Sequence, residues 1–130
     1  MPSFRLGKRS RAALVGVHPD LVRVIERAIQ ITPVDFVVLE GLRTEARQRE
    51  LVAAGASRTM RSRHITGHAV DLGALFDGVL TWRSEAYRRL APHVKRAARL
   101  EGAPIEWGGD WVSFVDLVHF QLPRREYPAA

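Results

Sequence analysis

The chain contains 130 residues and no cysteine, and its 20 lysine or arginine residues outnumber 14 acidic residues, for a formal net charge of +6. We expect one domain over residues 1–130, because a chain of this size buries a core without covalent staples. The absence of cysteine excludes disulfides and thiolate chemistry. The charge indicates a polyanionic partner or a basic solvated surface, and charge alone does not choose between them.

The N-terminal segment is basic, and a short apolar run follows it. Arg5, Lys8, Arg9 and Arg11 precede residues 12–17, and His18 then interrupts the apolar run. A secretory signal needs a longer apolar region and a cleavage site, and no stretch approaches the ~20 apolar residues of a membrane span. We therefore expect synthesis in the cytoplasm without a signal peptide, and no membrane span.

The first half of the chain predicts three helices and a strand. Ser10 is expected to cap a short helix over residues 11–15, and residues 19–29 predict an amphipathic helix with proline in its first turn. Residues 34–39 are β-branched and aromatic, which is typical of a strand. Thr44 then resembles an N-cap, and Gly55 is expected to end the helix that follows.

The second half of the chain predicts three strands and a long helix. Residues 69–75 predict one strand, and residues 84–100 a helix that Pro92 is expected to kink. Residues 104–107 and 118–122 predict two short strands. This order of elements favours an α+β fold, with a small antiparallel sheet flanked by helices, over a doubly wound parallel sheet.

Histidine and aspartate residues in two segments suggest a metal site. His64, His68 and Asp71 stand in one segment, and Asp116 precedes His119 by three positions in the other. Two imidazoles and a carboxylate leave a fourth zinc position open for water, as in catalytic zinc sites, whereas structural sites are closed by four ligands that are usually rich in cysteine. A helical zinc motif is a poor fit, because Ile65 stands where that motif needs glutamate and Gly67 disfavours a helix.

Strand geometry offers a way to bring three of these residues together. Alternate side chains of a strand share a face, so Asp71 on one strand and His119 on a neighbouring strand can lie side by side, with His64 joining them from a loop. Asp116 reaches the same site only if the chain turns or bulges around Leu117, and we predict that irregularity. Taken singly, each residue has an ordinary explanation, such as a surface histidine or a turn-forming aspartate.

The order of the residues adds a family resemblance. Ser62, His64, Gly67, Ala69 and Asp71, followed by the Asp-x-x-His pattern of residues 116–119, resemble the signature of the LAS-type zinc peptidases of bacterial cell walls. That family includes D-alanyl-D-alanine carboxypeptidases and the L-alanoyl-D-glutamate endopeptidases of phage endolysins. The segment 41–44 with the glutamine at 48, and the segment 106–122, are similar to the endopeptidase branch. Together the similar segments span residues 38–122.

The resemblance implies a fold similar to the hedgehog and D-Ala-D-Ala metallopeptidase domains and one catalytic zinc ion. It implies that His64, Asp71 and His119 bind the zinc, that Asp116 is the general base, and that Arg43 holds the substrate or the developing oxyanion. Further substrate contacts are expected from four residues, which are Ser62, Gln48, Trp107 and Asp110. His68 is expected at the rim of the site or in a structural role.

The function that the resemblance implies is that of a monomeric zinc endolysin, a peptidoglycan hydrolase without a separate cell-wall-binding domain. It would cut the L-Ala–D-Glu bond of the stem peptide after holin-type release to the cell wall, whose anionic groups suit the basic surface. The alternative within the family is a D-alanyl-D-alanine carboxypeptidase. A distant alternative is a basic nucleic-acid-binding module, but no nucleic-acid motif accompanies the charge, so no nucleic acid is expected. The complete ligand set argues against a catalytically inactive relative that only binds the wall.

Overall fold

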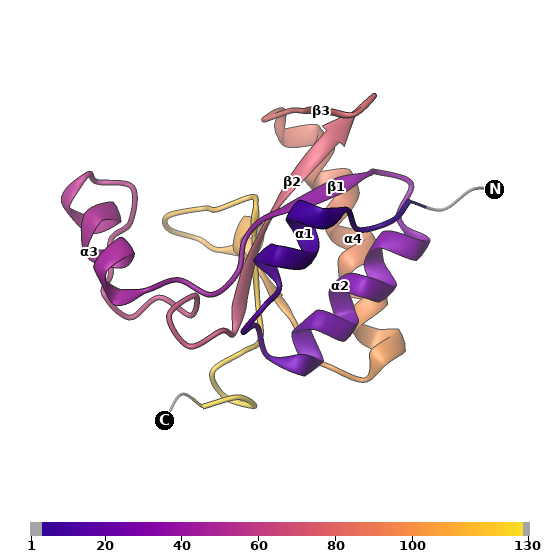
Figure 1. Ribbon diagram of the computed structural model, residues 1–130. Helices are drawn as coiled ribbons and strands as arrows, with labels where there is room; N and C mark the ends of the chain where they lie inside the picture. The colour runs from indigo at the N-terminus through magenta and orange to yellow at the C-terminus, as the bar shows by residue number, and fades with distance from the viewer. Residues whose placement is uncertain (1–3, 129–130) are drawn as a thin grey trace.

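The computed structural model describes residues 4–128, which form an α+β fold around one antiparallel sheet (Figure 1). The sheet has the strand order β1-β2-β5-β4, and β3 pairs with the far end of β2. Its strands are β1 (Phe36–Glu40), β2 (Ala69–Phe76), β3 (Val79–Leu80), β4 (Glu106–Trp107) and β5 (His119–Gln121). The helices are α1 (Lys8–Ala13), α2 (Pro19–Ile31), α3 (Glu45–Ala53) and α4 (Ser84–Glu101), with a 3₁₀ turn at Gly108–Asp110. The predicted fold class is confirmed.

Helices α1, α2 and α4 gather on one side of the sheet, whereas α3 stands apart on the other side (Figure 1). Helix α2 begins where the His18 side chain accepts a hydrogen bond from the Asp20 N–H, and Pro19 occupies its first turn. Helix α4 continues through Pro92 and ends at Gly102, which adopts the left-handed conformation that favours glycine. Within residues 4–128, no helix is both long and apolar enough to cross a membrane.

The core lies between the sheet and the pair α2 and α4. Val70 and Leu72 of β2 and Phe120 of β5 are fully buried in it. Because side chains alternate along a strand, burying these residues turns Asp71 and His119 to the opposite face of the sheet. The hydrophobic core therefore determines which face carries the polar residues, as predicted for these two strands.

One local prediction was wrong, and one strand was not predicted. Ser10 does not cap a helix but lies within α1, where its buried Oγ accepts a hydrogen bond from the Val38 N–H at 2.9 Å. Since β1 is an edge strand, this contact satisfies a backbone donor that no strand pairs. Strand β3 was not predicted. It forms a hairpin with β2 through Asp77 and Gly78, both of which have positive φ, as an Asp-Gly turn allows.

Replacing Ser10 with alanine tests the role of this contact. Ser10→Ala leaves the Val38 N–H buried without an acceptor, so we expect the free energy of unfolding to fall by about 1–3 kcal/mol. Urea denaturation measures it. The matched control is Ser84→Ala, at an exposed first position of α4, which should change stability by no more than about 0.5 kcal/mol. Equal effects of the two substitutions would contradict this role for Ser10.

Candidate active site

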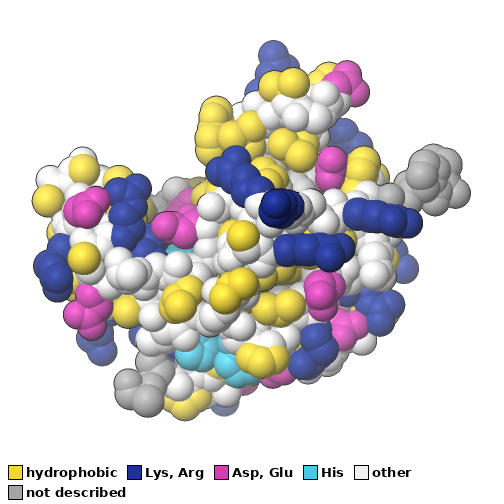
Figure 2. Space-filling view, in the orientation of Figure 1, with side chains coloured by type: hydrophobic (Ala, Val, Ile, Leu, Met, Phe, Trp, Pro, Cys, Tyr) yellow, Lys and Arg dark blue, Asp and Glu magenta, His cyan; other side chains and the backbone are white. Residues whose placement is uncertain are grey.

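A pocket of about 610 Å³ opens on the polar face of the sheet. One wall is the loop after α3, over residues 56–64, and the opposite wall is the loop over residues 111–118. The surface is hollowed between the α3 lobe and the rest of the molecule (Figure 2). Such a volume suits a peptide-sized ligand. His64, Asp71 and His119 all line this pocket.

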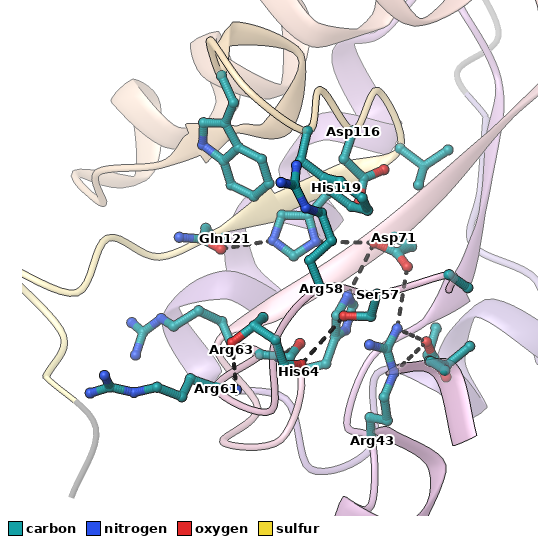
Figure 3. Close-up of a pocket in the computed structure, with 18 of the residues that line it drawn as sticks. Arg43, Ser57, Arg58, Arg61, Arg63, His64, Asp71, Asp116, His119 and Gln121 are labelled. Atoms are coloured by element: carbon teal, nitrogen blue, oxygen red, sulfur yellow. Dashed lines mark hydrogen bonds and ion pairs between the residues drawn. The ribbon is translucent and has the colours of Figure 1, made fainter. Parts of the chain in front are cut away.

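The two strands and the loop bring these three side chains together (Figure 3). Asp71 of β2 and His119 of β5 are direct partners in the antiparallel register. Asp71 Oδ1 lies 3.1 Å from His64 Nε2 and 3.3 Å from His119 Nδ1. One potential ligand atom from each residue lies within 4.8 Å of the others. The predicted convergence of the three residues is confirmed.

Hydrogen bonds behind the imidazoles aim their inner nitrogens at Asp71. His64 Nδ1 donates to the Gly41 carbonyl oxygen at 2.8 Å, and His119 Nε2 lies 2.8 Å from the amide oxygen of Gln121. An oxygen acceptor requires the proton on these outer nitrogens, so the inner nitrogens of the neutral rings present lone pairs. Three electron-pair donors then face one another around a small space. A divalent cation fits this donor set and relieves the mutual repulsion.

The pKa values of the cluster follow from the same contacts. Burial alone raises the pKa of Asp71, but hydrogen bonds and charges from His119 and His64 outweigh it and hold the pKa far below its ordinary value. For His119, burial disfavours the charged ring, yet the Asp71 hydrogen bond and charge raise its pKa. Both shifts describe the protein without a metal, where a proton bridges groups that otherwise repel.

Arg43 is tied to the cluster from the side of α3. Its backbone N–H donates to the His64 carbonyl at 2.9 Å, and its Nη2 lies 3.7 Å from Asp71 Oδ2. Its guanidinium also donates to Glu40 Oε1 and to Gln48 Oε1. Glu40 reaches this position through a register shift between Val38 and Glu40 that sets Glu40 opposite Asp71. Arg43 therefore lies in the pocket wall with its charge fixed beside Asp71.

Asp116 enters the pocket through the predicted irregularity at Leu117. Residues 117 and 118 form a turn, in which the His119 N–H donates to the Asp116 carbonyl at 3.3 Å, and regular strand begins only at His119. Behind the turn, the Asp116 N–H donates to the Gly108 carbonyl at 3.0 Å. Burial, and then the negative charge of Asp71, raise the pKa of Asp116 above its ordinary value. A carboxylate with a raised pKa is a better proton acceptor than a solvated one.

Of the four residues expected to contact substrate, only Ser62 lines the pocket. The Ser62 Oγ accepts a hydrogen bond from the His64 N–H at 3.2 Å. Gln48 is fully buried behind Arg43, with its amide donating to Ser57 Oγ and the Thr59 carbonyl, so it shapes the pocket wall from within. The expected contact with substrate is corrected for Gln48 on this ground.

Trp107 and Asp110 also lie outside the pocket lining. Trp107 packs in the core on Phe120, and its Nε1 donates to the Leu117 carbonyl at 2.7 Å, so it supports the turn behind Asp116. Asp110 pairs with Lys95 on the exposed surface. The expected substrate contact is corrected for Trp107, because core packing holds its side chain away from the pocket. For the exposed Asp110 the expected contact stays a prediction. The neighbouring Trp111 does line the pocket, with its ring centroid 5.1 Å from that of His119.

His68 and Arg63 belong to the support of the loop. His68 lies outside the metal-binding group; its Nδ1 is 2.7 Å from Thr66 Oγ1, and its ring neighbours His18 and Tyr127. The Arg63 guanidinium is buried and donates to the carbonyls of Leu122 and Tyr127. The C-terminal segment is thereby joined to the residue next to His64.

Sequence reasoning missed the supporting residues around the ligands. Glu40 and Gln121 have no motif of their own, although Gln121 follows His119 by the two positions that share a strand face. The Gly41 carbonyl contributes only backbone, which residue type does not reveal. Arg58 and Arg61 also line the pocket, and no motif marks them as site residues.

Comparison with known proteins shows which protein family the chain resembles. A sequence model described as phage L-alanyl-D-glutamate peptidase matches residues 2–119. The L-alanyl-D-glutamate peptidase of Escherichia phage T5 is 33% identical over 129 residues, which cover 96% of this chain and 93% of that protein. The L-alanyl-D-glutamate peptidase of Listeria phage A118 is 36% identical over 94 residues, 72% of this chain and 32% of that longer protein.

A solved structure agrees with these relatives. The crystal structure of the Serratia marcescens L-Ala D-Glu endopeptidase ChiX superposes with a TM-score of 0.92 at 54% sequence identity, covering 98% of this chain and 96% of that one. The fold is thus similar to that of a known L-Ala–D-Glu endopeptidase. The chain belongs to the phage L-alanyl-D-glutamate peptidase family.

Gly41 offers a test of how the site is positioned. A Cβ at this position would clash with the Ala13 carbonyl oxygen and lie 2.6 Å from Val17 Cγ2. We expect Gly41→Ala to lower the free energy of unfolding by about 1–3 kcal/mol, because the segment that holds His64 must shift. Gly7→Ala is the control, since a Cβ there meets nothing within 4 Å. Chemical denaturation that finds Gly41→Ala as stable as the control would contradict this prediction.

Proposed function

We propose that this protein is a zinc-dependent endopeptidase that hydrolyses the L-Ala–D-Glu bond of the peptidoglycan stem peptide. Membership of the L-alanyl-D-glutamate peptidase family supports the choice of bond. The observation that carries the metal dependence is the convergence of His64 Nε2, His119 Nδ1 and Asp71 Oδ1 on one space. The pocket around this space is large enough for the peptide.

The proposed zinc ligands are His64, Asp71 and His119. Gly41 and Gln121 hold the two rings in the tautomers that ligation needs. Three protein ligands leave a coordination position for water or substrate. A zinc ion held there supplies Lewis-acid chemistry, because it polarises a peptide carbonyl and makes a water molecule more acidic.

Asp116 is the proposed general base. It lies in the wall of the same pocket, and its raised pKa favours uptake of a proton from the attacking water. The same carboxyl group then delivers the proton to the leaving amine of D-glutamate. The turn at Leu117, held by Trp107 and Gly108, keeps Asp116 in place through both transfers.

Arg43 is proposed to stabilise negative charge that develops on the scissile carbonyl. It lines the pocket, and its contacts with Glu40 and Gln48 fix the guanidinium before substrate arrives. Fixed donors of this kind typically contribute about 3–4 kcal/mol to transition-state stabilisation. Arg43 also holds Asp71 through the oxygen that faces away from the imidazoles.

The proposed site of action is the bacterial cell wall. We propose that the enzyme acts there as a monomer after holin-type release, as one catalytic domain over residues 1–130. The net charge of +6 supports adhesion to the anionic wall. Peptidoglycan is the proposed partner, and no nucleic acid is required for the reaction.

Two substitutions separate metal binding from proton transfer. We expect Asp116→Asn to retain about one zinc per chain and to lose about 10²–10⁴ in kcat, because only the proton acceptor is removed. We expect His119→Ala to lose both zinc and turnover. Elemental analysis and hydrolysis of purified sacculi measure the two properties. Asp77→Asn is the control, since this exposed residue lies in the β2–β3 turn outside the pocket. Near-normal turnover of Asp116→Asn would remove Asp116 from the mechanism.

The products identify the bond. Mass spectrometry of digested peptidoglycan should detect stem peptides that begin with glutamate, released from glycan strands that retain alanine. A D-alanyl-D-alanine carboxypeptidase would instead release single terminal alanine residues. Release of alanine alone would contradict the proposed bond while leaving the zinc site intact.

A further inference from the structure

Arginine side chains dominate the outer part of the pocket. Six of the lining residues are arginines, at positions 43, 47, 58, 61, 63 and 124. Three of these have partners: Arg43 contacts Glu40 and Asp71, Arg47 contacts Glu50, and Arg63 is buried on backbone carbonyls.

The other three arginines are exposed and uncompensated. Among the described residues, no carboxylate lies within 4.0 Å of the side-chain nitrogens of Arg58, Arg61 or Arg124. An exposed guanidinium without a carboxylate partner is free to bind an anion, and its planar fork matches a carboxylate. The outer pocket therefore offers anion-binding capacity that the protein itself does not use.

These cations are held at the pocket mouth. Arg58 and Arg61 lie on the loop that leads into His64, and the Arg58 guanidinium stacks over the Phe114 ring of the opposite wall at 5.1 Å from its centroid. Arg124 donates to the Arg61 carbonyl and so ties this loop to the C-terminal segment.

Acidic and basic groups are separated within the pocket. The three acidic residues of its lining are Glu40, Asp71 and Asp116. Glu40 and Asp71 are engaged by Arg43 and the imidazoles, and Asp116 is the proposed proton acceptor. Arg58, Arg61 and Arg124 therefore add positive charge to a pocket whose acidic side chains are already engaged or assigned to proton transfer.

The proposed substrate carries a matching group. A glutamyl residue has two carboxyl groups, and when one continues the peptide chain, the other is free either as a carboxylate or as an amide. In the proposed reaction this residue lies on the leaving side of the scissile bond, directly beside the reacting atoms. Its second carboxyl group is therefore an anionic group of the substrate close to the scissile bond.

We propose that Arg58 and Arg61 form a subsite for this second carboxylate, and that the enzyme selects stem peptides in which the glutamate is not amidated. The proposal rests on the proposed function and adds a substrate preference to it. An amide has a neutral oxygen and two N–H donors. Its oxygen cannot form charge-assisted hydrogen bonds as strong as those of a carboxylate, and its N–H groups find no acceptor on a guanidinium group.

A pair of synthetic stem peptides tests this subsite. The peptides are identical except that the second carboxyl group of D-glutamate is free in one and amidated in the other. We expect the wild-type enzyme to cleave the free acid with a kcat/KM about tenfold higher, the effect of one charge-assisted hydrogen bond. We expect Arg58→Gln and Arg61→Gln to raise KM for the acid and to leave cleavage of the amide nearly unchanged, so that the ratio falls toward one.

Matched variants separate recognition from general charge. Arg88→Gln removes one positive charge at an exposed position of α4 outside the pocket and should preserve the wild-type ratio. Arg61→Lys keeps the charge but loses the planar fork, and should recover part of the preference. Arg58, Arg61 and Arg88 are all exposed, so these substitutions should leave the midpoint of thermal unfolding nearly unchanged. An unchanged midpoint would exclude a folding defect.

Different outcomes would contradict the proposed subsite and the proposed function on which it rests. Equal cleavage of the two peptides by the wild-type enzyme would contradict the proposed subsite but not the proposed function. A tenfold preference that survives in both glutamine variants would place recognition elsewhere. Failure to cleave either peptide, with an active enzyme on another bond, would remove the proposed function and the subsite with it.

Discussion

The Asp71 carboxylate lies where β2, β5 and the loop before β2 meet, and most of the polar face is arranged around it. One oxygen faces His64 Nε2 and His119 Nδ1, and the other faces Arg43. The outer nitrogens of both rings are hydrogen bonded to oxygens, so neutral rings direct lone pairs at a carboxylate. That arrangement is repulsive unless a proton or a cation occupies the space between the donors.

The core on the other face of the sheet makes this arrangement possible. Burying Val70, Leu72 and Phe120 leaves Asp71 and His119 no choice of face. The register shift at Glu40 and the close packing of Gly41 against α1 then bring the Gly41 carbonyl to His64. Packing energy, spread over many apolar contacts, offsets the cost of holding charged and polar groups together.

Features that depend on neighbouring residues in the sequence could be predicted, whereas features that depend on contacts between distant segments could not. The side-by-side placement of Asp71 and His119 follows from the period of two in their strands, and the turn at Leu117 follows from the need to bring Asp116 to the same face. Gln48 and Trp107 show the limit. Their types and positions suited a cleft, but only tertiary packing reveals that one supports Arg43 and the other supports the turn behind Asp116. Ser10 resembled a helix cap because hydroxyls commonly cap helices, whereas its partner lies 28 residues away on β1.

Different parts of the pocket thus serve different needs of one reaction. Its floor carries the proposed metal ligands and the proposed proton acceptor, and its mouth carries guanidinium groups without a carboxylate partner among the described residues. An anionic floor and a cationic wall suit a substrate that must be both activated at a carbonyl and held by a carboxylate. The proposed metal site and the proposed carboxylate subsite therefore use different residues of one pocket.

The most direct test of the metal site is crystallographic. Diffraction from zinc-loaded crystals, recorded on both sides of the zinc absorption edge, locates zinc without reference to activity. One anomalous peak should lie about 2.0–2.2 Å from His64 Nε2, His119 Nδ1 and an oxygen of Asp71. A fully active protein whose zinc lies elsewhere, or that holds no zinc between these side chains, would contradict the metal centre.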